Sequence, residues 1–152
     1  MARFRPLPGA RIPLFDRLVD EAPWEPGEPR PLRVMDTPAL KESIARDVAR
    51  LFNTQKPIQR DTLHIPGTVL DYGIPDIISR PLFSSEAKQV LCADLVRAVR
   101  AFEPRLADVR VVPGEFDDKH RSLSVSVFGT LTVGEVGEPL SFPVVIHALR
   151  RE

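Results

Sequence analysis

The residues with catalytic or ligand potential are spread along the chain and form no known catalytic set. The three histidines, His64, His120 and His147, lie far apart, so no pair has the spacing of a metal site. The only cysteine, Cys92, falls beside the apolar stripe of a predicted helix, which favours a buried thiol over a nucleophile. The eight glycines form neither a GxGxxG nor a GxxxxGK[ST] phosphate loop. We therefore expect no metal, no cofactor and no nucleophilic centre.

Paired carboxylates are the remaining route to chemistry, because glycoside hydrolysis uses one carboxyl group as an acid and a second as a base or nucleophile. Asp71 with Asp76, and Glu103 with Glu115, are the formal candidates. Nothing in the sequence places either pair across a sugar-binding cleft, and carboxylates are common on any protein surface. The sequence therefore favours a protein that is not an enzyme, with a cell-wall glycosidase as the rival hypothesis.

A Glu-Pro-Arg triplet, Glu103, Pro104 and Arg105, follows the second predicted helix. A carboxylate at a helix C-terminus faces the negative end of the helix dipole, so Glu103 needs a nearby cation. Arg105 is two residues away, and its planar guanidinium can bind a carboxylate through two hydrogen bonds. The apolar neighbours Phe102 and Leu106 predict partial burial, where an unpaired charge is costly. The triplet is either an internal latch between helix and sheet or a polar contact for a partner.

An apolar loop with the sequence Leu-Asp-Tyr-Gly-Ile-Pro-Asp, residues 70–76, precedes that helix. Gly73 permits a backbone conformation that other residues resist, and Pro75 keeps the residue before it extended. Asp76 can accept backbone hydrogen bonds in a turn, or it can cap a short helix over residues 77 and 78. Tyr72, the only tyrosine, is amphipathic and suits an interface. We expect a rigid loop over the core, with a ligand site as the alternative.

The first of two predicted amphipathic helices positions these motifs. Thr37 is expected as its N-cap, Pro38 takes its first helical position, and Asn53 with Thr54 closes it. One stripe faces a core and consists of apolar residues at helical spacing: Leu40, Ile44, Val48, Leu51 and Phe52. The solvated side holds charged residues: Lys41, Glu42, Arg46, Asp47 and Arg50.

The second helix is predicted to begin at Ser84 or Ser85 and to end before Pro104, and its wide apolar stripe indicates packing against a sheet. Alternating apolar and polar residues predict three strands, over residues 109–112, 123–133 and 142–148. The links at 114–120 and 134–139 carry turn residues, as antiparallel neighbours require. The predicted fold is α+β, with helices packed on one face of a small antiparallel meander of about three strands.

The N-terminal part of the chain differs from the rest in its proline content. Residues 1–38 hold half of the 16 prolines of the 152-residue chain, which predicts an extended arm. We therefore expect an N-terminal docking turn and proline-rich arm over 1–38 and an α+β domain over 39–152. Leu14, Phe15 and Leu18 share one side of a short helical turn, which can contact its own domain or a partner.

Charge and hydropathy exclude several classes of function. Basic and acidic residues both number 21, and this zero net charge argues against a nucleic-acid binder. No apolar run approaches the ~20 residues that span a bilayer, and residues 1–13 lack the apolar stretch of a signal peptide. A single cysteine fits a reducing compartment. We expect a cytoplasmic protein that binds no nucleic acid and does not insert into membranes.

Three motifs in this order resemble those of the TssE family, baseplate subunits of bacterial type VI secretion systems related to phage baseplate wedge proteins once described as lysozymes. The motifs are IARDVARLFNT at 44–54, LDYGIPD at 70–76 and FEPRL at 102–106. Residues 14–18 also resemble the secretion-system members more than the phage ones. The chain departs from the family pattern at three positions: Asp71 replaces the usual Asn, Gln55 a frequent Arg, and Ile74 a common Leu.

The resemblance implies a structural baseplate component in the bacterial cytoplasm, docked at the inner membrane. Its implied partners are the wedge proteins TssF and TssG, the baseplate protein TssK and the sheath subunits TssB and TssC, and its implied role includes starting sheath polymerisation. A phage-tail-like injector is the alternative machine. The residues expected to serve assembly are Glu103, Pro104, Arg105, Tyr72, Gly73, Pro75, Asp76, Leu14, Phe15 and Leu18.

The predicted meander has two open edges, and an extended segment of another chain can add a strand there. Family members resemble the part of the sheath subunit that links by strand exchange, so the resemblance implies such a contact. Because Pro143 lacks an N–H, we expect strand addition at residues 144–149 or at the other edge of the sheet.

Overall fold

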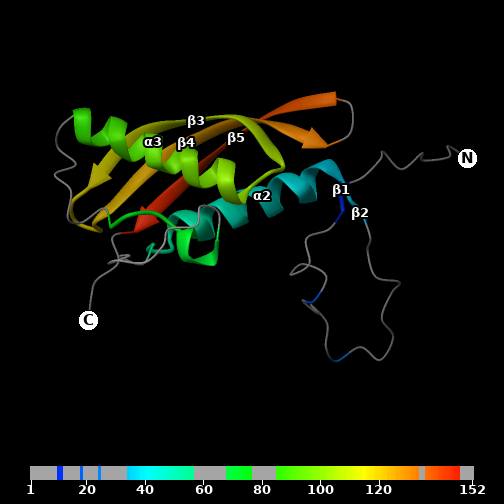
Figure 1. Ribbon diagram of the computed structural model, residues 1–152, viewed down its shortest axis with the longest axis horizontal. Coiled ribbons are helices and arrows are strands. Elements are labelled where there is room, and N and C mark those ends of the chain that lie inside the picture. The colour runs from blue at the N-terminus through cyan, green and yellow to red at the C-terminus, as the bar shows by residue number, and fades with distance from the viewer. Residues whose placement is uncertain are drawn as a thin grey trace, which may run out of the picture.

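Two helices pack on one face of a three-stranded antiparallel sheet in the computed structural model of the chain (Figure 1). Helix α2 spans Thr37–Phe52 and helix α3 spans Ser85–Phe102. The strands β3, β4 and β5 span Leu106–Asp117, Ser122–Val133 and Val136–His147, and they are neighbours in that order. The structure describes residues 10–11, 18, 24, 34–56, 68–76, 85–133 and 136–147. The predicted α+β fold is confirmed.

The helix limits follow the sequence prediction closely, with one correction. The N-cap of α2 is Asp36 rather than Thr37, and the Asp36 side chain accepts a hydrogen bond from the Ala39 N–H at 2.9 Å. Asp is a stronger N-cap than Thr, and Pro38 is tolerated in the first turn, where backbone N–H groups have no helical partner. Asn53 is the C-cap, as predicted.

The core lies between the helices and the sheet. The apolar stripes predicted for both helices meet the inward side chains of the strands there. Each large apolar side chain that is fully buried contributes about 1.5–3 kcal/mol. The largest fully buried apolar residues are Phe52, Ile44, Leu51, Leu91, Leu95, Leu123, Ile146, Val48, Val99, Val125 and Val127. Within the described residues, no helix combines the length and the apolar character needed to cross a membrane.

Both outer strands are longer than the sequence predicts. Strand β3 continues through Pro113 to Asp117, and β5 begins before Pro139, so the predicted links at 114–120 and 134–139 were too long. A proline can lie in an edge strand without loss of a ladder hydrogen bond when its nitrogen faces outward. A register shift between Pro113 and Phe116 also gives β3 a bulge that accommodates the extra residues.

The side chain of Asn53 occupies part of the outer edge of β5. Its Nδ2 donates to the carbonyl oxygens of Ala49 at 2.8 Å and of Val145 at 3.0 Å, and its Oδ1 accepts from the His147 N–H at 2.9 Å. The amide thus takes the place of a neighbouring strand. The expectation that residues 144–149 form an open edge is therefore wrong for Val145 and His147, and residues beyond 147 lie outside the described part.

The outward positions of β5 explain where its prolines are tolerated. Backbone groups of an antiparallel edge strand point outward at every second residue. Because Val145 and His147 use their outward groups on Asn53, the same parity places Pro143 and Pro139 outward. These two positions therefore offer no N–H to an incoming strand.

A short antiparallel pair lies ahead of α2. Strand β1, Ala10–Arg11, pairs with β2, Val34–Met35, so these two short segments lie side by side although they are more than 20 residues apart in the sequence. Of the predicted docking turn, Leu14 and Phe15 lie outside the described residues, while Leu18 is helical and 69% exposed. The domain boundary at residue 38 stays a prediction.

Replacing Asn53 by Ala should lower the free energy of unfolding by about 1–2 kcal/mol, because two hydrogen bonds to β5 and one to the Ala49 carbonyl of α2 are lost at a partly solvated site. Urea denaturation followed by circular dichroism measures this change. Glu42→Ala on the exposed side of α2 is the matched control and should change stability by less than about 0.5 kcal/mol. Equal midpoints for the two variants would contradict the role of Asn53.

Candidate functional site

The Glu-Pro-Arg triplet forms a turn between α3 and β3, and its two charges bind each other. The Arg105 Nε donates to Glu103 Oε1 at 2.6 Å, and Nη2 donates to Oε2 at 2.5 Å. The Leu106 N–H donates to the Glu103 carbonyl at 3.2 Å and closes the turn across Pro104. Arg105 is thus the cation that Glu103 needs at the negatively polarised C-terminal end of α3.

Arg105 also reaches helix α2. Its Nη2 donates to Asp47 Oδ2 at 2.7 Å, and its Nη1 donates to Ser43 Oγ at 3.2 Å. Ser43 and Asp47 are four residues apart, so both lie on the same side of the helix. Asp47 was predicted on the solvated side of the helix, but its side chain is only 32% exposed and pairs with Arg105.

The backbone of the triplet is bound to strand β4. The Thr132 N–H donates to the Arg105 carbonyl at 2.9 Å, and the Thr132 hydroxyl donates to the same oxygen at 3.1 Å. Four elements, α2, α3, β3 and β4, therefore meet at Arg105. We call Ser43, Asp47, Glu103, Arg105 and Thr132 the Arg105 network.

Burial makes the pairing of these charges obligatory. Glu103 is only 4% exposed, and a carboxylate so buried is destabilising without a partner. Burial alone would lower the pKa of the Arg105 guanidinium, but the hydrogen bond and charge of Glu103, followed by those of Asp47, outweigh it and raise the pKa. Arg105 therefore stays charged. Among the described residues, no buried polar side-chain atom lacks a hydrogen-bond partner.

Tyr72 connects the 70–76 loop to this network. Its ring packs edge-on against Phe102, with centroids 5.2 Å apart and an interplanar angle of 73°. Burial, followed by the negative charge of Asp47, raises the pKa of the Tyr72 hydroxyl, so the ring stays neutral beside the carboxylates. The loop and the triplet, which the sequence analysis treated separately, are thus brought together.

Gly73 fixes the loop to the end of α2. Its φ is +105°, and a Cβ at this position would lie 2.5 Å from the Thr54 carbonyl oxygen. The adjacent Ile74 N–H donates to that oxygen at 2.9 Å, and the Lys56 N–H donates to the Ile74 carbonyl at 2.8 Å. Only glycine fits this approach, which agrees with the rigid loop that the sequence predicts.

Asp71 and Lys56 form a second ion pair, which links the loop to the segment after α2. The Lys56 Nζ donates to Asp71 Oδ1 at 2.5 Å, and Asp71 is only 8% exposed. Asp71 carries a charge where the family resemblance implies Asn, and Lys56 pairs with this charge. Lys56 is a residue of this site that the sequence did not predict, although it lies only two residues after the end of the first motif.

The other predicted site residues lie apart from the Arg105 network. Pro75 and Asp76 line a small hollow with Gln55 and His147 at the end of α2. The short helix expected after Asp76 lies outside the described residues. Glu103, Arg105 and Tyr72 therefore lie close together, whereas Pro75 and Asp76 line the separate hollow at the end of α2.

The arrangement has little capacity for acid–base chemistry. Both oxygens of Glu103 accept hydrogen bonds from Arg105, and Asp71 is paired with Lys56, so neither is free to protonate a glycosidic oxygen. Burial raises the pKa of the Cys92 thiol, which keeps it unreactive at neutral pH. Within the described residues, no group of three or more histidine, cysteine or acidic side chains could hold a metal ion.

Comparisons with known proteins agree with this fold, which defines a small α+β domain built around an internal salt bridge. Residues 38–135 match the family described as baseplate wedge protein gp25, and the chain belongs to that family. A chain of the baseplate complex from the type VI secretion system has a similar fold, with a TM-score of 0.51 and 17% identity. That similarity covers 72% of this chain and 96% of the other.

A crystal structure of a tail-lysozyme-like protein from Geobacter sulfurreducens is also similar, with a TM-score of 0.46 and 16% identity over 74% of this chain and 95% of the other. No curated protein sequence matches the chain. The predicted resemblance to gp25-like baseplate proteins is confirmed by the family match.

Arg105→Ala should lower the free energy of unfolding by about 3 kcal/mol, because it leaves the buried carboxylate of Glu103 unpaired. Arg105→Lys should lower the free energy of unfolding by less, because an ammonium group keeps the positive charge beside Glu103. Some loss should remain, because an ammonium group cannot form two parallel hydrogen bonds to the carboxylate. Urea denaturation measures both changes. Arg97→Ala on the exposed side of α3 is the control, and a loss at Arg105 no larger than at Arg97 would refute an internal role.

Lys56→Met should lower the free energy of unfolding by about 1–2 kcal/mol, because the nearly buried carboxylate of Asp71 would lose its ion pair with Lys56. Adding Asp71→Asn in the same chain should restore most of the loss, since the amide needs no cation. Thermal and urea unfolding of the two single variants and the double variant measure the coupling. Additive losses would show that the two side chains are independent.

Proposed function

We propose that the chain is a TssE-type baseplate subunit of a type VI secretion system. The observation that carries the baseplate role is the gp25 match over residues 38–135, which covers both helices, β3 and β4. The three TssE-like motifs at 44–54, 70–76 and 102–106, and the fold shared with a chain of a type VI baseplate complex, add support. The protein is then a structural part in the bacterial cytoplasm, in a baseplate docked at the inner membrane.

The proposed partners are the wedge proteins TssF and TssG, the baseplate protein TssK and the sheath subunits TssB and TssC. We propose that the domain offers them a rigid surface and that sheath polymerisation starts on it. Strand addition is proposed at β3, because Asn53 and the outward positions of Pro139 and Pro143 restrict the edge of β5.

The residues expected to serve assembly keep that role as a proposal. Glu103, Pro104 and Arg105 act by holding the turn in one shape, while the partly exposed edge of Arg105, 19% of its side chain, is within reach of a partner. Tyr72, Gly73, Pro75 and Asp76 present the adjoining loop, and the apolar turn with Leu14, Phe15 and Leu18 is the proposed docking element of the arm over residues 1–38.

The same part in a phage-tail-like injector is the second candidate, because the gp25 match does not distinguish the two machines. A cell-wall glycosidase is disfavoured, because the carboxylates of Glu103 and Asp71 are engaged by basic side chains.

Co-expression with TssF and TssG from the same gene cluster should yield a complex that co-purifies on a tag placed on this chain. Deletion of residues 1–33, which keeps the Asp36 N-cap, should reduce the recovered TssF and TssG about tenfold if the arm docks on them. Circular dichroism of the deletion variant controls for folding. Absence of a complex with the full chain, or peptidoglycan hydrolysis lost in Glu103→Gln, would overturn the proposed function.

A further inference from the structure

The strand register shows which backbone groups of β3 point at the open edge of the sheet. The Thr132 N–H of β4 donates to the chain segment just before β3, so the backbone groups of Thr132 point toward β3. These groups alternate in direction along a strand, and β4 pairs with β5 without a register shift, so those of Phe128 point the same way. Arg110 is the β3 partner of Phe128 and bonds to it. Val109 and Val111, on either side of Arg110, therefore turn their backbone groups outward.

The length of this open edge is limited at both ends. Outside the sheet, no hydrogen bond to Val109 or Val111 is present in the described part of the chain. Unpaired backbone groups along a strand edge are a template for another strand. Pro113, the next outward residue, offers a carbonyl oxygen but no N–H. A bulge after Ala107 interrupts the strand at the other end. An incoming strand can therefore pair in full only with Val109 and Val111.

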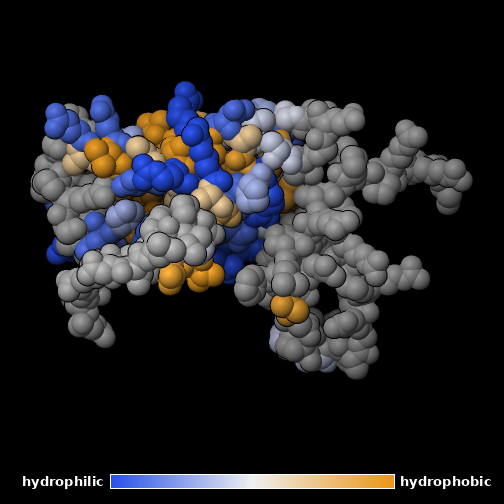
Figure 2. Space-filling view, in the orientation of Figure 1, coloured by the Kyte–Doolittle hydropathy of each residue, from blue (hydrophilic) through white to orange (hydrophobic). Residues whose placement is uncertain are grey.

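The helix side of this edge favours apolar residues in the incoming strand. The side chains of Val109 and Val111 are buried, and residues directly opposite them in a neighbouring strand place their side chains on the same face. Helix α3 packs on β3 on this side, and its Val90 is 54% exposed. Figure 2 shows apolar side chains between hydrophilic ones on the helix side of the molecule. Two apolar residues of a new strand would therefore extend an apolar surface that already exists.

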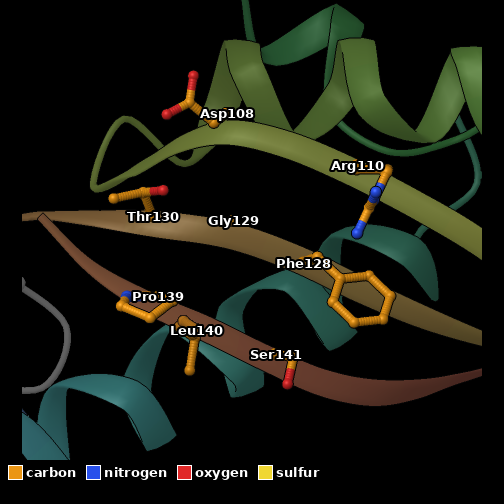
Figure 3. Close-up of a pocket in the computed structure, with 8 residues that line it drawn as sticks. All are labelled: Asp108, Arg110, Phe128, Gly129, Thr130, Pro139, Leu140 and Ser141. Carbon is orange, nitrogen blue, oxygen red and sulfur yellow. The ribbon is translucent and has the colours of Figure 1, made fainter.

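Arg110 provides a positive charge between these two positions, on the outer face of the sheet. Its guanidinium carbon lies 5.1 Å from the centroid of the Phe128 ring, and Figure 3 shows the side chain extending from β3 toward that ring. Among the residues that the structure describes, no acidic side chain forms an ion pair with Arg110, which is exposed. Opposite charges on neighbouring strands attract and like charges repel. A residue opposite Arg110 is therefore favoured when it is acidic.

We propose that β3 accepts a short extended segment of another protein chain in which one acidic residue stands between two apolar residues. The two apolar residues bond to the backbone of Val109 and Val111, and the acidic side chain pairs with Arg110. Asp108, exposed in the bulge, repels a second acidic residue and so helps to fix the register. This inference rests on the strand addition proposed at β3, and it specifies which residues the added segment carries.

The full chain, extended at its C-terminus by a flexible Gly/Ser linker of about 20 residues and a Thr-Val-Glu-Val-Thr segment, tests the inference by NMR amide exchange. The amides of Val109 and Val111 should exchange about fivefold more slowly than in the unextended chain, because their N–H groups become bonded. A matched chain with Lys in place of Glu in the segment should stay within about twofold of the unextended chain. In Arg110→Glu, the order of the two segments should reverse.

Two controls identify the edge and the fold. The Ser141 amide points outward from β5 between two prolines, and it should exchange at the same rate in all of these chains. Circular dichroism and urea midpoints show that Arg110→Glu is folded.

The outcomes separate this inference from the proposed function. Unchanged exchange at Val109 and Val111 in both extended chains overturns the inference, and equal slowing by the Glu and Lys segments does so too. Slower exchange at Ser141 instead would place the added strand at β5 and also overturn it. The baseplate role depends on co-purification with TssF and TssG, so a failure there overturns the proposed function without any change in the exchange data.

Discussion

The buried carboxylate of Glu103 is the constraint on which the rest of the structure depends. It stands at the C-terminal end of α3, where the helix dipole and the low exposure both disfavour a negative charge. Arg105 resolves this by binding both carboxylate oxygens, and its remaining donors then reach Ser43 and Asp47 of α2. One local electrostatic requirement therefore sets where α2 lies relative to the turn between α3 and β3.

The loop before α3 makes a second set of internal contacts, at the C-terminal end of α2. Gly73 allows the loop backbone to approach Thr54, Tyr72 packs on the ring beside Glu103, and Lys56 neutralises the nearly buried Asp71. These contacts pair the polar groups of the loop with other groups of the protein and fix the shape of the loop. The chain belongs to the baseplate wedge gp25 family, which is generally structural.

The sequence predicted the parts of the fold that depend on local spacing. Helical stripes and strand alternation located the elements, and the helix dipole argument correctly paired Arg105 with Glu103. The contacts of Arg105 with Asp47 and Ser43 span 58 and 62 residues, and no local pattern specifies which side of α2 faces the turn. Asn53 bonding to the edge of β5, and the tolerance of Pro139 in that strand, likewise follow only from the position of β5 at the sheet edge.

Native-state hydrogen exchange tests most directly whether the Arg105 network holds its elements as one unit. The Leu106 N–H bonds to the Glu103 carbonyl, and the Thr132 N–H bonds to the Arg105 carbonyl, so both amides report on the turn. If the network is continuous, both should exchange only through global unfolding, with the same opening free energy and denaturant dependence as the amide of Val127 in the central strand. Exchange of Leu106 and Thr132 by a local opening, several kcal/mol easier and insensitive to denaturant, would contradict this account.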